Sequence, residues 1–177
     1  MYVLNNALPD DILVKNCERV TPGSQFHPQH GILKKTYVYR FFLQRSDPMM
    51  QRYGHVLERK IDMHILGQAL SLFAGTHDFR AFSKEPHDKN TVRTIEAIML
   101  MPCQKLGGYK IVIEGKSFLR HMIRRIVGAA FEIASRPDRS CNELKRLLLI
   151  PKLPKNLPTA PAKGLCLESI AYTYEGV

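Results

Sequence analysis

The stretch GKSFLRHMIRRIVGAAFEIAS, residues 115–135, reads as the end of a strand followed by a capped helix. The hydroxyl of Ser117 can accept a backbone N–H of the first helical turn, which predicts a helix start at this serine. Apolar residues then recur at helical spacing and form one stripe: Leu119, Met122, Ile123, Ile126, Val127, Ala130 and Phe131. The chain is therefore expected to build its core around this helix.

Charged residues flank that apolar stripe on both sides. Arg120 and Arg124 lie four residues apart on one flank, and His121 and Arg125 lie four apart on the other. A guanidinium at the edge of a core-facing helix is suited to hold an anion in a cleft. The helix pattern alone favours the alternative, an amphipathic core helix whose arginines are solvated. Gly128 lacks a side chain, so another backbone could approach the helix there.

The composition is that of a basic globular protein. The 177 residues include 45% apolar and 24% charged residues, which fits one domain or two small lobes that share a core. Lysine and arginine number 26 against 16 acidic residues, a net charge of +10. This excess favours a polyanionic partner, with nucleic acid first, over a protein that is basic without binding one.

Cysteine usage and hydropathy indicate the cellular compartment of the protein. The four cysteines stand singly with no C-x-x-C spacing, which disfavours a zinc site or a disulfide framework and favours a reducing compartment. No apolar run approaches the length of a membrane span, and the first residues lack a signal-peptide pattern. We expect a cytoplasmic protein with no membrane partner, although the sequence says little about an organelle or the nucleus.

Alternation and capping signals predict the order of the elements. The expected strands cover residues 12–14, 34–44, 91–101, 109–114 and 165–174, with Gly107 and Gly108 as the turn of a hairpin. Besides the central helix, one helix is expected from Asp62 to residue 74 and a short one from a Ser140/Glu143 capping box. The order predicts an α+β fold in which helices pack on a largely antiparallel or mixed sheet.

Local chemistry alone does not identify a reaction. The histidines lack a metal-binding spacing apart from a weak hint at His27 and His30. Asp78 is the best isolated carboxylate, yet a residue that only caps a turn would look the same. Residue chemistry therefore indicates a basic α+β domain that binds RNA.

Six short motifs, which occur in a fixed order along the chain, indicate a more specific function. They are LNNALPDDILV at 4–14, FH at 26–27 followed by KTYVY at 35–39, GTHDF at 75–79, TVRTI at 91–95, FLRHMIRRIVG at 118–128 and APAKGLCL at 160–167. Together they resemble the TruA-type family of tRNA pseudouridine synthases over nearly the whole chain. Cys166 departs from the family, which often has an aromatic residue at that position.

The resemblance implies an isomerase that converts uridine to pseudouridine in tRNA without a cofactor, and a homodimer in the complete protein. By motif position, Tyr37 stacks on the flipped base, Arg124 pairs with the catalytic aspartate and Leu165 lines the pocket. RNA contacts are expected at Lys34, Lys35, Arg40, Arg120 and the 152–163 loop, which includes Lys163.

One family motif has no counterpart in the chain. The family's aspartate lies in a G-R-T-D segment, which is absent from the 177 residues. We therefore expect residues 1–177 to be the C-terminal RNA-binding and pocket-forming part, with 1–45 as linking strands toward a missing N-terminal lobe, and to be inactive alone. The alternatives are a catalytically silent RNA-binding module and a subunit that needs a separate N-terminal lobe.

Overall fold

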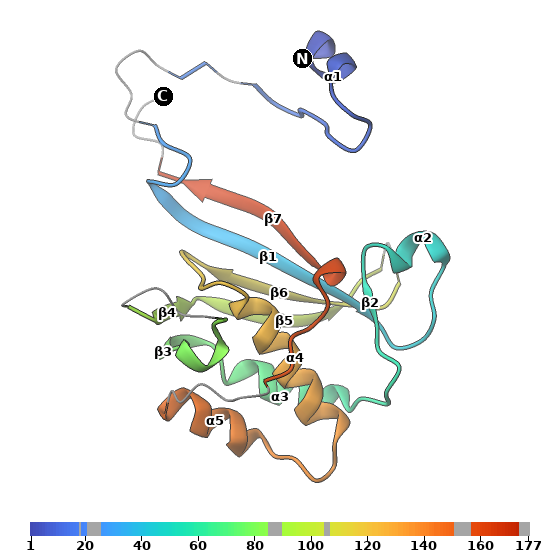
Figure 1. Ribbon diagram of the computed structural model, residues 1–177, viewed down its shortest axis with the longest axis vertical. Helices are drawn as coiled ribbons and strands as arrows, with labels where there is room; N and C mark the ends of the chain where they lie inside the picture. Colours follow the sequence, from blue (N-terminus) through green and yellow to red (C-terminus); the bar gives the residue numbers. More distant parts are fainter. Residues whose placement is uncertain (18, 21–25, 85–89, 105–106, 151–156, 174–177) are drawn as a thin grey trace. The chain divides into compact units, whose positions relative to one another are not determined.

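The computed structural model describes residues 1–177 except 18, 21–25, 85–89, 105–106, 151–156 and 174–177 (Figure 1). The chain forms two compact units, and each is described by itself. One contains residues 32–172, and the other contains residues 1–31 with 173–177. The larger unit carries every residue predicted for the site.

Strand β1 (Ile32–Phe42) is the centre of the main sheet. It pairs antiparallel with β6 (Tyr109–Gly115) and β7 (Leu165–Tyr172), and parallel with the short β2 (His55–Val56). Strand β5 (Ala97–Pro102) extends the sheet beyond β6. The predicted mixed, largely antiparallel sheet is confirmed.

Helices α3 (Met63–Ser71), α4 (Met122–Ser135) and α5 (Cys141–Leu149) lie on the same side of this sheet (Figure 1). Phe131 of α4 brings its ring to 6.0 Å from the ring of Tyr39 and 5.0 Å from that of Phe41, centroid to centroid. All three side chains are buried, as is most of α4. The predicted α+β core around this helix is confirmed.

The start of α4 differs from the prediction. The helix begins at Met122 rather than near Ser117, and His121 precedes it with a φ of 62°. The intervening residues form a turn because they have tertiary partners. The ring of Phe118 packs edge-on against Tyr37 at 5.3 Å, and the carbonyl of Arg120 accepts the amide of Lys84. The assignment of Ser117 as the helix cap was wrong.

The predicted strand at residues 91–101 is in fact two strands. Strand β4 (Val92–Ile95) pairs with β3 (Gly75–Asp78) in a separate two-stranded sheet, whereas β5 belongs to the main sheet. The change occurs at Glu96, whose amide donates to the carbonyl of Glu114 in β6. The strand therefore switches sheets at this residue.

Local signals correctly predicted two helix starts and one turn, although α3 ends at Ser71 rather than at residue 74. Asp62 caps α3 by accepting the amides of His64 and Ile65, and the Ser140/Glu143 capping box is present at α5. Gly107 and Gly108 both have positive φ, as a tight hairpin turn requires. The connection after β1 contains the short helix α2 (Pro48–Gln51) and β2. Two single turns, η1 (Arg80–Phe82) and η2 (Ala162–Gly164), complete the larger unit.

The smaller unit contains helix α1 (Tyr2–Ala7). The predicted strand at residues 12–14 is absent and that expectation was wrong. The side-chain amide of Asn5 donates to the carbonyl of Val14 and accepts its N–H, so it takes the place of a neighbouring strand. Among the described residues, no helix is long and apolar enough to cross a membrane.

Candidate active site

The candidate site lies where the first turn of α4 meets the segment just before β7. We call Pro158–Pro161 the strap. The backbone N–H of Ala160 donates to the carbonyl of Arg124 at 2.9 Å, and the Nε of Arg124 donates to the carbonyl of Ala160 at 2.7 Å. In the part of the chain that the structure describes, no carboxylate pairs with Arg124. Its two terminal amino groups are therefore the donors suited to hold an anion.

Gly128 makes this contact sterically feasible. A Cβ at this position would lie 2.5 Å from the carbonyl oxygen of Pro158 and 2.9 Å from the amide nitrogen of Ala160. Real Cβ atoms are essentially never so close to backbone atoms. The prediction that Gly128 allows another backbone to approach the helix is confirmed, and the strap is that backbone.

Tyr37 and Leu165 lie on the neighbouring strands β1 and β7. Tyr37 and Tyr39 are two residues apart on β1, so both side chains lie on the side that faces the helices. Leu165 on β7 is paired with Tyr39. Burial raises the pKa of Tyr37, so its hydroxyl is protonated at neutral pH. The ring of Tyr37 is half-buried with Phe118 against its edge. An apolar, partly open ring face of this kind could stack on a planar base.

The predicted RNA-binding cations do not share one surface. Lys34 and Arg40 lie on the face of β1 away from the helices, where they form ion pairs with Glu114 at 3.1 Å and Glu168 at 3.4 Å. Lys35 lies on the same side as Tyr37, and Lys163 is in η2 directly after the strap. Lys152 and Lys155 lie outside the described residues. The structure thus separates Lys34 and Arg40 from the candidate site.

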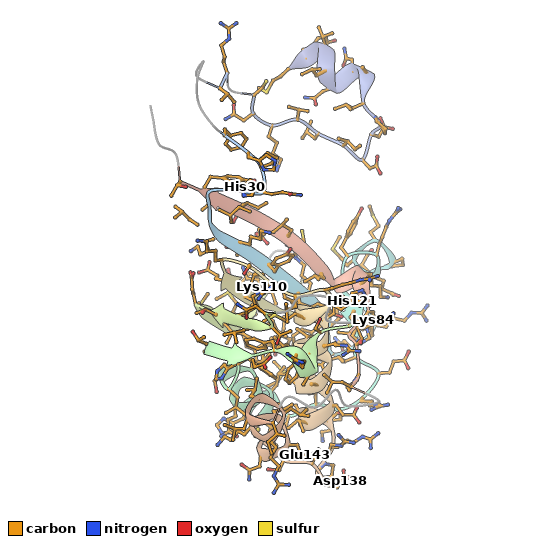
Figure 2. All side chains as sticks on the ribbon, turned by 60° about the vertical axis from the view of Figure 1, so that its left-hand side comes forward. His30, Lys84, Lys110, His121, Asp138 and Glu143 are labelled. Atoms are coloured by element: carbon orange, nitrogen blue, oxygen red, sulfur yellow. The ribbon has the colours of Figure 1, made fainter. Side chains whose placement is uncertain are left out.

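Cations gather around the start of α4. Figure 2 shows His121 near Lys84, and the amide of Lys84 bonds the carbonyl of Arg120. The pKa of His121 is lowered by burial and then by the positive charges of Arg124, Arg120, Lys84 and Arg125. A helix N-terminus adds a partial positive charge. Sequence analysis did not place Lys84 in this basic cluster, because its contact with Arg120 joins residues far apart in the chain.

Arg125 differs from its neighbour Arg124. Its Nη1 donates to the carbonyl of Ser83 at 2.7 Å and to that of Ala81 at 3.4 Å. Ser83 and Ala81 are buried. Arg125 therefore ties α4 to the turn after β3, and its role is structural.

A cavity of about 360 Å³ borders the strap. His55, Glu58, Phe131, Glu132 and Ser135 are among its lining residues, together with the strap itself. None of the residues predicted for the site lines it. The strap therefore contacts Arg124 and also lines this cavity.

Asp78, the best isolated carboxylate in the sequence, is engaged in its own turn. Its Oδ1 accepts the amide of Arg80 at 2.9 Å and the hydroxyl of Thr91 at 2.5 Å. This is the turn-capping role that the sequence left open. Among the described residues, no group of three or more histidine, cysteine, aspartate or glutamate side chains could hold a metal ion.

The geometry defines a basic α+β protein with an anchored arginine, a half-buried aromatic ring on the central strand β1 and an apolar residue on the neighbouring strand β7. Comparison with known proteins identifies the family. Residues 69–173 match the family model for tRNA pseudouridine synthase, and the chain belongs to this family.

Two relatives illustrate the extent of the match. tRNA pseudouridine synthase A 1 of Protochlamydia amoebophila is 37% identical over 177 residues, which cover 97% of this chain and 67% of the relative. tRNA pseudouridine synthase A of Thermodesulfovibrio yellowstonii is 36% identical and is covered to 70% of its length. The family resemblance read from the six motifs is confirmed.

Proposed function

We propose that this chain supplies the RNA-binding surface and the base pocket of an enzyme that isomerises uridine to pseudouridine in tRNA. Arg124 is the partner of a nucleophilic aspartate, Tyr37 stacks on the target base, and Leu165 lines the pocket. The observation that carries the proposal is the anchoring of Arg124 by Ala160, with no carboxylate partner among the described residues. A guanidinium oriented in this way would keep an incoming carboxylate ionised, as a nucleophile must be.

The nucleophile itself is proposed to come from outside these 177 residues. The G-R-T-D segment of the family is absent from the sequence, and the carboxylate of Asp78 is occupied by Arg80 and Thr91. We further propose that the complete enzyme is a cytoplasmic homodimer. In the reaction, the bond between uracil and ribose breaks, the base rotates, and it is rejoined to the sugar through carbon.

The chain alone is therefore expected to form no pseudouridine, because covalent catalysis needs a carboxylate held within bonding reach of the nucleoside. The test is mass spectrometry of unmodified tRNA incubated with the chain, with and without a G-R-T-D-containing lobe from a relative added in trans. Product in the mixture only would support the proposal. Product from the chain alone would overturn the external nucleophile, and tRNA binding without product in any mixture would favour a silent RNA-binding module.

Binding of tRNA is expected to depend more on Lys35 than on Lys34. Lys35 lies on the Tyr37 side of β1, whereas Lys34 is already paired with Glu114. Lys35→Ala should weaken tRNA binding and reduce the slope of log affinity against log salt by about one. Lys34→Ala is the matched control and should change the slope little. The measurement is filter binding between low and physiological salt, and equal slopes for the two variants would contradict the assignment.

The protonation of His121 is expected to lower the stability of the folded chain as the pH falls below neutrality. Its pKa is lowered in the folded protein, so the unfolded chain binds the proton more readily. His121 therefore favours folding above its ordinary pKa and opposes it as the pH falls below about 6.5. The His121→Asn variant, in which asparagine tolerates the positive φ, should lose less stability between pH 7 and pH 5 than the parent chain.

Nuclear magnetic resonance (NMR) titration of the parent chain should place the pKa of His121 below 6.5 without tRNA and higher with tRNA. An unchanged pKa on adding tRNA would mean that no phosphate approaches this cluster.

A further inference from the structure

The orientation of Arg124 depends on a short segment that is held at several points. The strap meets α4 at Gly128, where there is no room for a side chain, and it bonds Arg124 twice through Ala160. Because a guanidinium is planar, a hydrogen bond at Nε fixes the plane in which the terminal amino groups lie. A shift of the Ala160 carbonyl would therefore redirect those amino groups.

Tyr39 holds the far end of the strap. Its hydroxyl donates to the carbonyl of Pro161 at 3.0 Å, one residue after Ala160. The ring is completely buried, packed edge-on against Phe131, and a Cβ at Gly164 would lie 2.6 Å from its Cζ. The hydroxyl has little freedom to choose another partner. Burial also raises the pKa of Tyr39 well above its ordinary value, although the charge of Arg124 opposes this, so the hydroxyl remains a donor at any working pH.

We propose that Tyr39 is a positioning residue, which holds the strap through the Pro161 carbonyl so that Ala160 orients Arg124 toward its carboxylate partner. Tyr39 contacts no reacting group in this assignment, and the inference rests on the proposed function of Arg124. Tyr37 and Tyr39, which are separated by one residue on β1, then have separate roles. Tyr37 presents its ring to the base, and Tyr39 presents its hydroxyl to the backbone that supports the arginine.

Tyr39→Phe removes a single oxygen and keeps the buried ring, so it isolates the hydrogen bond. Tyr109→Phe is the matched control. Tyr109 lies on the adjacent strand β6 and stacks on Phe41 at 5.6 Å, away from the strap. Gly128→Ala is a second route to the same effect, because its methyl group would push the strap from the α4 side.

The first readout is the side-chain N–H of Arg124 Nε, followed by NMR in the 177-residue chain. Tyr39→Phe and Gly128→Ala are expected to speed its hydrogen exchange at least about tenfold, since the bond to Ala160 loosens. The amide protons inside α4 should keep their protection. Unchanged exchange at Arg124 Nε in a folded Tyr39→Phe variant would overturn the inference, as would an equal acceleration throughout α4.

The second readout is kinetic and uses the pseudouridine-forming mixture described above. Tyr39→Phe is expected to lower kcat by about tenfold with KM for tRNA unchanged, because a displaced catalytic partner affects the chemical step and not binding. A rise in KM alone would contradict a positioning role. Exchange at Arg124 tests this inference, whereas Arg124→Ala tests the proposed function, so the two failures are distinguishable.

Discussion

Arg124→Ala is expected to lower the turnover number for pseudouridine formation by about 10²- to 10³-fold and to leave the affinity for tRNA nearly unchanged. The guanidinium would act on a carboxylate at the chemical step, so its loss affects the transition state more than binding. Single-turnover assays with saturating enzyme, together with tRNA filter binding, separate the two quantities. A large loss of affinity with normal turnover would instead make Arg124 a simple phosphate contact.

Arg125→Ala is the matched control for Arg124, because both substitutions remove one positive charge from the same turn of α4. Arg125 donates to the carbonyls of Ser83 and Ala81, so its removal leaves buried acceptors without a partner. We expect a loss of about 1–3 kcal/mol in unfolding free energy and nearly normal turnover in the folded fraction. Equal turnover losses after correction for folding would mean that the helix supplies only general positive charge.

Phe131→Ala is expected to cause the largest loss of stability, about 3–5 kcal/mol in the free energy of unfolding. The ring packs against Tyr39 and Phe41, and it also lines the 360 Å³ cavity. Removing it would leave a gap beside the buried rings of Tyr39 and Phe41, which cannot move far to fill it. Urea unfolding followed by circular dichroism measures the change.

Leu149→Ala is the control for Phe131→Ala, because Leu149 ends α5 with 79% of its surface exposed. It should change the unfolding free energy by no more than about 0.5 kcal/mol. A Phe131→Ala variant as stable as this control would show that the aromatic cluster is not the centre of the core.

The parts of the fold that could be predicted from the sequence have local causes. Asp62, the Ser140/Glu143 pair and the Gly107–Gly108 turn act on backbone groups within a few residues, so their signatures are short and readable. The start of α4 and the break at Glu96 could not be predicted. Both depend on distant partners, namely Lys84 for the turn before α4 and Glu114 for the break.

The candidate site was predictable in its residues but not in its arrangement. The motif comparison identified Arg124, yet its anchor Ala160 lies 36 residues later in the chain. Likewise, nothing near Lys34 in sequence indicates its ion pair with Glu114, 80 residues away. The first pairing depends on how the strap packs on α4 and the second on the register of β1 against β6, and neither is encoded locally.

The pairing of β1 has a consequence for the order of synthesis on the ribosome. Tyr39 emerges well before its strand partners Ile111 and Leu165 are translated. Until then, the edges of β1 are unpaired and its aromatic side chains are exposed. Such surfaces bind chaperones or aggregate. The strap and β7 are translated after the other strands of the sheet, so the surroundings of Arg124 are completed only then. Pairings this distant predict slow folding, on the order of milliseconds to seconds, with the site formed in its final phase.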